Sequence, residues 1–136
     1  MLTLKRLLAL AFAALIASPV AALDAIEAEA MAKLLAAKPA PLLLDVRSEE
    51  EFAQGHLPGA RLIPHDQIAE RLAELGAPGE IYIYCRSGRR TKIAAVALEQ
   101  AGFSVHEIAG SYQAWQAAEL PIERPSKDLS NKEKTQ

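Results

Sequence analysis

IYIYCRSGRR, residues 81–90, is the stretch of sequence on which the predicted fold of this 136-residue chain depends. The apolar run from Ile81 to Tyr84 is typical of a buried β-strand, and it ends at Cys85, the only cysteine in the sequence. A loop of glycine and arginine follows, and a helix is predicted over residues 91–101. A thiol in this position lies where loop amides and a helix N-terminus converge, and both favour the thiolate over the thiol. The segment therefore predicts an anion-binding loop that carries a reactive cysteine.

Predicted strands and helices alternate on both sides of this segment. Further strands are expected at residues 42–46, 61–64 and 104–108. Further helices are expected from residue 24 to Lys38-Pro39, and at residues 49–53, 66–75 and 110–115. Because the connections are short, the fold class is α/β, with a small parallel β-sheet flanked by helices on both faces. Ligands of such sheets bind outside the carboxyl ends of the strands, and Cys85 lies at one of these ends.

Three of the predicted helices begin with a capping signal. Asp24 is expected to be an N-cap, with Glu27 as its partner in a capping box. Ser48 is expected to cap the helix at residues 49–53, and Asp66 is expected to cap the helix that runs to Leu75. Side-chain caps of this kind fix where a helix begins along the chain.

Residues 1–22 have the pattern of a secretory signal peptide. Lys5 and Arg6 form a short basic region, an apolar run begins at Leu7, and small residues precede a cleavage site after Ala22. A retained membrane anchor is the alternative, but the apolar run is about 14 residues long and a spanning helix needs roughly 20. We therefore expect cleavage, export to the periplasm and no stable membrane insertion after processing.

The rest of the chain is long enough for one domain. Residues 23–125 contain the predicted strands and helices, and 51% of the sequence is apolar, enough for a buried core. Residues 126–136 are polar and are expected to form a disordered tail. The formal charge of −2 and the lack of a basic tract argue against a nucleic-acid partner, and we expect a monomer. Because no second cysteine is present for a disulfide after export, Cys85 is a candidate reactive thiol.

Four motifs, in order along the chain, resemble those of the rhodanese-type sulfurtransferases. They are Asp45-Val46-Arg47, the segment Glu51-Phe52 with Gly55-His56-Leu57-Pro58-Gly59-Ala60, the loop Cys85-Arg86-Ser87-Gly88-Arg89-Arg90, and Gly110 to Trp115. The match extends from about Asp24 to Ile122, and the single-domain, exported form is most similar to the phage-shock protein E type. The resemblance implies a rhodanese-like domain over residues 23–125. The family commonly has a second glycine where this chain has Ser111, which we expect to cap the last helix without loss of function.

The resemblance also implies a two-step sulfur transfer. A donor such as thiosulfate gives its outer sulfur to Cys85, which forms a persulfide, and a thiophilic acceptor such as cyanide then takes that sulfur. No cofactor and no metal are expected. The arginines of the loop suit a small anionic donor, and consecutive loop amides can surround the persulfide sulfur. The expected substrate-binding residues are Arg86, Ser87, Gly88, Arg89, Arg90 and Thr91.

Other polar and aromatic residues near these motifs are expected to be structural. A carboxylate beside the thiolate would raise the pKa of Cys85, so Asp45 is expected to pair with a cation or with backbone donors. His65 and His106 have no supporting context in the sequence. The remaining residues expected to have structural roles are His56, Tyr112 and Trp115.

Two other functions stay open at this point. Tyrosine phosphatases and arsenate reductases also use a cysteine in an anion loop, but the phosphatase loop has arginine at the sixth position after its cysteine. This chain has Thr91 there and Arg90 one residue earlier, so the loop is tighter than a tetrahedral phosphate requires. A non-catalytic persulfide carrier or sensing module would keep the same cysteine, and the sequence does not separate it from an enzyme.

Overall fold

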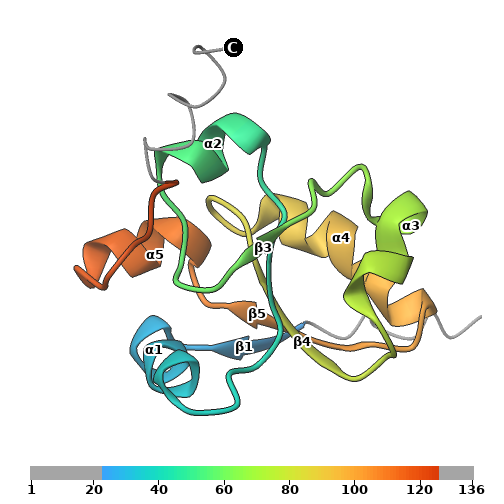
Figure 1. Ribbon diagram of the computed structural model, residues 1–136, viewed down its shortest axis with the longest axis horizontal. Coiled ribbons are helices and arrows are strands. Elements are labelled where there is room, and N and C mark those ends of the chain that lie inside the picture. Colours follow the sequence, from blue (N-terminus) through green and yellow to red (C-terminus); the bar gives the residue numbers. More distant parts are fainter. Residues whose placement is uncertain (1–22, 126–136) are drawn as a thin grey trace, which may run out of the picture.

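The computed structural model describes residues 23–125, so the expected signal peptide and the expected polar tail lie outside the described residues. Five parallel strands form one sheet in the order β1-β5-β4-β2-β3 (Figure 1). The strands are β1 (Asp24–Ile26), β2 (Leu43–Asp45), β3 (Arg61–Leu62), β4 (Glu80–Tyr84) and β5 (Ser104–Ile108). The parallel α/β class expected from the alternation is confirmed.

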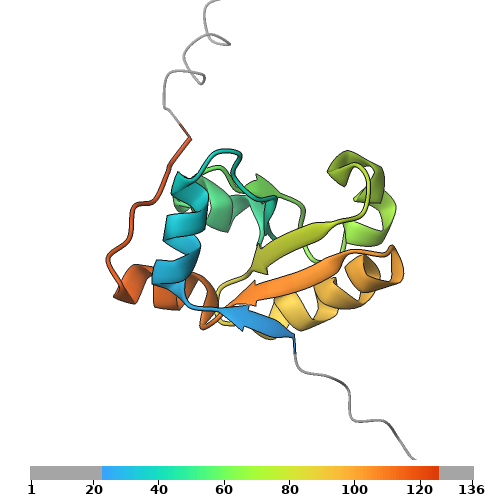
Figure 2. The ribbon, with the colours of Figure 1, turned by 90° about the horizontal axis from the view of Figure 1, so that it is seen from below.

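Helices cover both faces of this sheet (Figures 1 and 2). They are α1 (Ala28–Ala36), α2 (Glu49–Gln54), α3 (Ile68–Arg71) with a 3₁₀ turn at Leu72–Leu75, α4 (Arg89–Gln100) and α5 (Ser111–Ala117). α1 and α5 lie on one face, and α3 and α4 lie on the other. Among residues 23–125, no helix is long and apolar enough to cross a membrane.

The central strand β4 divides the core into two clusters, one on each face of the sheet. Ile81, Ile83 and Cys85 belong to the cluster under α3 and α4, whereas Tyr84 belongs to the cluster under α1 and α5, with Trp115. Successive side chains of a strand point to opposite faces, which explains this division. As a result, the Cys85 side chain faces α4 and the Tyr84 side chain crosses to the other side of the sheet.

The predicted N-cap at Asp24 is wrong. Asp24 begins β1, which pairs with β5 through Asp24 and His106 and through Ile26 and Ile108. Helix α1 starts after Glu27, which makes no side-chain capping bond. The physical reason is that pairing with β5 satisfies the backbone of residues 24–26 in the sheet, and this tertiary contact outweighs a local helix signal.

The predicted cap at Asp66 is also wrong. The amide of Gln67 donates to the carbonyl of Pro64 at 2.9 Å, so Asp66 lies inside a turn and α3 begins only at Ile68. The cap at Ser48 is confirmed, because its hydroxyl accepts from the Glu51 amide at 3.2 Å and the Glu51 carboxylate accepts from the Ser48 amide. The Ser48 cap is a reciprocal capping box, in which Ser48 and Glu51 each satisfy a backbone amide of the other.

Candidate active site

The Cys85 loop joins β4 to α4 and places the cysteine sulfur against backbone amides. Cys85 is only 1% exposed, and the Gly88 amide donates to its Sγ at 3.0 Å. Gly88 is the N-cap of α4, two residues earlier than the sequence predicts, and has a φ of 110° in the left-handed region. Glycine adopts this conformation freely, so Gly88 both turns the loop and aims its amide at the sulfur.

These amides decide the charge of the sulfur. Burial raises the pKa of the Cys85 thiol, but hydrogen bonds from the amides of Thr91, Gly88, Ser87 and Arg90 outweigh burial and lower the pKa below its ordinary value. All four amides belong to the loop and to the first turn of α4, where unpaired N–H groups point out of the helix. The site therefore stabilises the thiolate of Cys85 relative to that of an ordinary, exposed thiol.

A cavity of about 350 Å³ opens beside the sulfur, and we call it the Cys85 cavity. Arg86 and Arg89 are exposed at its edge, and neither makes an ion pair within residues 23–125. These two guanidinium groups can therefore bind a small oxyanion through their N–H donors. The complete set of residues around the cavity is His65, Cys85, Arg86, Ser87, Arg89, Arg90 and Ile93.

Arg90 and Thr91, both expected to bind substrate, are engaged by the protein itself. The Arg90 guanidinium donates to both carboxylate oxygens of Glu51, at 2.6 and 2.8 Å. The Arg90 hydrogen bond lowers the pKa of Glu51 to about 2. The Thr91 hydroxyl donates to the Gly88 carbonyl at 2.7 Å and is 3.0 Å from a Glu107 oxygen. Both side chains thus hold the loop in shape, while their amides face the sulfur.

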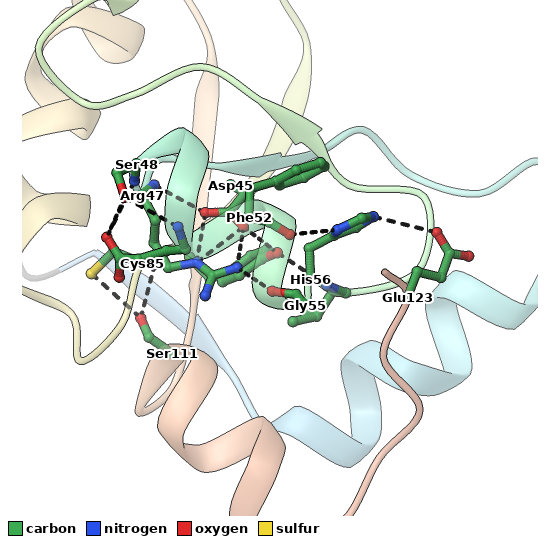
Figure 3. A network of polar contacts seen from close by, with 12 residues as sticks. Asp45, Arg47, Ser48, Phe52, Gly55, His56, Cys85, Ser111 and Glu123 are labelled. Atoms are coloured by element: carbon green, nitrogen blue, oxygen red, sulfur yellow. Dashed lines mark hydrogen bonds and ion pairs between the residues drawn. The ribbon is translucent and has the colours of Figure 1, made fainter. Parts of the chain in front are cut away.

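Ser111 takes a role that the sequence did not indicate. It is 1% exposed and has a φ of 53°, and α5 has no side-chain cap. Its Oγ accepts from the Cys85 amide at 3.3 Å and lies 3.9 Å from the Cys85 Sγ (Figure 3). Because the oxygen already accepts from an amide, its proton is free to point at the sulfur. The expected helix cap is thus wrong, and this hydroxyl lies against the Cys85 amide and sulfur instead.

α5 also fixes the Cys85 loop through its backbone. The amide of Tyr112 donates to the Cys85 carbonyl at 3.0 Å, and the amide of Gln113 donates to the Arg86 carbonyl at 3.1 Å. With the Ser111 bond, three hydrogen bonds hold residues 85–86 against the start of α5. The first turn of a helix has free amides for such contacts.

A buried ionic network lies next to this loop, at the end of β2 (Figure 3). Arg47 donates to both oxygens of Asp45, with a shortest distance of 2.6 Å, and the Tyr84 hydroxyl donates to the same carboxylate at 2.7 Å. Burial and the Asp45 charge raise the pKa of Tyr84. The expectation that Asp45 pairs with a cation is confirmed, and the positive charge of Arg47 compensates the negative charge of this carboxylate.

The histidines lie at buried or half-buried positions. His56 stacks on Phe52 with ring centroids 3.7 Å apart, and its Nδ1 lies 3.1 Å from the Phe52 carbonyl, so its structural role is confirmed. His65, which had no context in the sequence, lines the Cys85 cavity. Its position just after β3 was the available signal, since the carboxyl ends of parallel strands share one edge of the sheet.

Comparisons with known proteins agree with this geometry. The profile of the Rhodanese-like domain matches residues 27–118. A sulfurtransferase from Allochromatium vinosum is 37% identical over 101 residues, which are 74% of this chain and 94% of that protein. Thiosulfate sulfurtransferase 16, chloroplastic, from Arabidopsis thaliana is 36% identical over 91 residues, 57% of this chain and 76% of that protein. The crystal structure of a rhodanese-like domain protein from Staphylococcus aureus has a TM-score of 0.68 and 29% identity, and the match covers 76% of this chain and 100% of that chain.

Proposed function

Because the chain belongs to the rhodanese-like domain family of sulfurtransferases, we propose that it moves the outer sulfur of thiosulfate, or of a similar anionic donor, to a thiophilic acceptor such as cyanide. The sulfur would travel as a persulfide on Cys85. The observation that carries this proposal is the Cys85 Sγ, held 3.0 Å from the Gly88 amide beside a cavity edged by Arg86 and Arg89.

The chemistry needs no outside oxidant or base. The Cys85 thiolate attacks the outer sulfur of thiosulfate, the S–S bond of the donor breaks, and its electron pair leaves on sulfite. The product is a Cys85 persulfide anion that lies among the loop amides. Cyanide then attacks the outer sulfur, the new S–S bond breaks, and its electron pair returns to the Cys85 Sγ as thiocyanate departs.

The electrostatic requirement is met by several groups together. Each unit by which a thiol pKa falls takes about 1.4 kcal/mol of preferential stabilisation of the anion. One helix N-terminus supplies about 0.3–1 kcal/mol in an exposed setting. Hydrogen bonds from several loop amides lower the pKa of Cys85, and Arg86 and Arg89 add positive charge at the edge of the cavity. The loop as a unit, rather than one arginine, is therefore the basis of the reactivity.

Intact mass spectrometry after incubation with thiosulfate tests the proposal. We expect the protein to gain the mass of one sulfur atom, and to lose it again as thiocyanate when cyanide is added. A Cys85→Ser variant is the control and is expected to gain nothing. No mass gain on the unaltered protein would contradict the proposal. A sulfur that loads but is not released to cyanide would favour the second function, a persulfide carrier that serves a partner protein.

We also propose that the protein is an exported, periplasmic member of the phage-shock protein E type. Support comes from the basic, apolar and small-residue pattern of residues 1–22 and from the single rhodanese-like domain. The same mass measurement on protein isolated from the periplasmic fraction is expected to give a chain that begins at Leu23. A full-length chain, or recovery only from the cytoplasmic fraction, would contradict export.

A further inference from the structure

A second cavity, of about 390 Å³, shares only Arg86 with the Cys85 cavity. Its walls come from the turn after β2, from α2 and α5, and from the chain that follows α5. We call it the Arg47 cavity. Besides Arg86 and Glu51, the residues that line it are Arg47, Gln54, Tyr112, Gln116 and Arg124. Its volume lies within the range of about 300–1,000 Å³ that small-molecule sites occupy.

This cavity has uncompensated positive charge. Glu51 is the only carboxylate among its lining residues, and both of its oxygens already accept from Arg90. Arg86 and Arg124 make no ion pair within residues 23–125. The cavity therefore attracts an anion next to Arg86, and Cys85 is not among its lining residues.

The Arg47 guanidinium is a rigid donor at the wall of this cavity. Arg47 is 3% exposed; its Nε and Nη2 donate to Asp45, and Nη2 also donates to the Gly55 carbonyl at 2.7 Å. The group lies 4.1 Å from the centre of the Tyr112 ring. Its Nη1 donates to no group within the described part of the chain (Figure 3). A buried guanidinium with one unpaired terminal nitrogen is ready to bind an anionic ligand without rearrangement.

Three more side chains offer donors to the same space. Arg124 lines the cavity; its Nε donates to the Gln54 carbonyl at 3.0 Å, and its two terminal nitrogens make no hydrogen bond within residues 23–125. The side-chain amides of Gln54 and Gln116 make no hydrogen bond within residues 23–125. Planar guanidinium groups and amides together suit a carboxylate, which accepts several N–H donors at once.

We propose that the Arg47 cavity binds the carboxylate end of a small thiol acceptor, whose thiol lies at Cys85 on the other side of Arg86. This inference rests on the proposed sulfur transfer and names its acceptor class. Neither thiosulfate nor cyanide is large enough to need a second cavity of this size. Arg86 borders both cavities, so it can face the donor in the first step and the carboxylate of the acceptor in the second.

The transfer balances without a further reactant. The thiolate of the acceptor attacks the outer sulfur of the Cys85 persulfide and forms a new S–S bond. The bond between that sulfur and the Cys85 Sγ breaks, and its electron pair stays on Sγ as thiolate. The acceptor leaves as a persulfide, and Cys85 is ready for the next donor.

Two matched acceptors test the proposal. Protein loaded with thiosulfate is mixed with N-acetyl-cysteinyl-glutamate, which has two carboxylates, or with N-acetyl-cysteinyl-glutamine amide, which has none. Discharge is followed by intact mass, and each rate constant is divided by the thiolate fraction of the acceptor. We expect the dicarboxylate to discharge the protein about tenfold faster, the effect of roughly one charge-assisted contact.

Two variants test whether the preference for the dicarboxylate acceptor arises in the Arg47 cavity. Arg124→Gln is expected to remove most of the preference for the dicarboxylate, and Gln116→Glu, which adds a negative charge to the cavity, is expected to abolish or reverse it. Arg61→Gln is the matched control, because Arg61 is an exposed arginine on β3 that lines neither cavity. Equal rate constants for the two acceptors, or an equal loss of preference in Arg61→Gln, would overturn the proposal.

A binding measurement separates this inference from the proposed activity. In calorimetry, Cys85→Ser protein is expected to bind N-acetyl-alanyl-glutamate measurably more tightly than N-acetyl-alanyl-glutamine amide. Binding of this kind would support the carboxylate site even if thiosulfate did not load Cys85. Loading of Cys85 by thiosulfate without any preference for the carboxylate peptide would overturn the site and leave the sulfurtransferase intact.

Discussion

The ends of β2 and β4 are neighbours in the sheet. Charged side chains at the end of β2 are paired with each other, whereas those that follow β4 include arginines that are unpaired among the described residues. At the end of β2, Asp45 and Arg47 are buried and neutralise each other. At the end of β4, backbone amides meet the Cys85 sulfur, and Arg86 has no carboxylate partner within residues 23–125. The difference indicates a division of labour, in which charge satisfied by the protein fixes the fold and charge left open is available to a substrate.

Asp45→Asn removes the paired charge at the end of β2, and we expect it to lower the free energy of unfolding more than any other change described below. It leaves the buried Arg47 without its counter-charge, and breaking a buried pair costs about 3–5 kcal/mol. The free energy of unfolding in urea measures the loss. Glu74→Gln, which removes an exposed ion pair with Arg71, is the control and is expected to change stability far less. A similar small change in both variants would contradict a structural role for the buried pair.

The double variant Arg86→Gln, Arg89→Gln removes the positive charge at the edge of the Cys85 cavity that is unpaired within residues 23–125. Because these two guanidinium groups attract the anionic donor, we expect the thiosulfate concentration for half-maximal loading of Cys85 to rise about tenfold or more. The fold is expected to stay intact, since neither group has a carboxylate partner in the described residues. Unaltered loading kinetics would show that the open charge does not serve the donor.

Ser111 variants test whether the hydroxyl acts on the Cys85 sulfur or only on the backbone at the start of α5. Ser111→Gly and Ser111→Ala both remove the hydroxyl, so both are expected to raise the pKa of Cys85 and lower the thiolate fraction about threefold. They differ in the backbone, because alanine at a positive φ costs about 1 kcal/mol and glycine does not. The pH dependence of alkylation, read with thermal stability, separates the two effects. Unchanged alkylation profiles in both variants would mean that the hydroxyl serves only the backbone.

Glu51→Gln is expected to have the smallest effect. Glutamine keeps the capping box with Ser48 but loses the ion pair with Arg90. The native pKa of Glu51 is lowered to about 2 from an ordinary value of 4.5, so its contribution to stability is complete above pH 4.5 and is lost as the pH falls towards 2. For a partly exposed pair, a difference below about 1 kcal/mol is expected. Urea unfolding at neutral pH and at acid pH measures it; a difference that grows on acidification would contradict the assigned sign.

The sequence predicts the features that depend on neighbours along the chain. The strand ending at Cys85 and the Ser48 cap are local, so periodicity and composition are enough to locate them. β1 was missed because a strand of three residues gains its stability from β5, which lies about 80 residues away. The Asp66 cap failed for a different, local reason, because a turn closed by the Gln67 amide and the Pro64 carbonyl occupies the position.

The same distinction separates the two cavities. Most of the Cys85 cavity comes from one continuous loop, and the sequence shows that loop directly. The Arg47 cavity combines side chains from α2, α5 and Arg124, which are far apart in the chain and come together only in the fold. Ser111 was visible as a departure from the family pattern, but the direction of its hydroxyl depends on the backbone geometry at the start of α5.

The ionisation of Cys85 is the most direct test of the whole account. The rate of alkylation by iodoacetamide, measured against pH and checked by the ultraviolet absorbance of the thiolate, gives the pKa of this single cysteine. Amide hydrogen bonds from the loop predict a midpoint below the ordinary thiol value of 9.0. A midpoint at or above 9.0 would mean that the loop does not hold a thiolate, and it would contradict the proposed sulfur transfer.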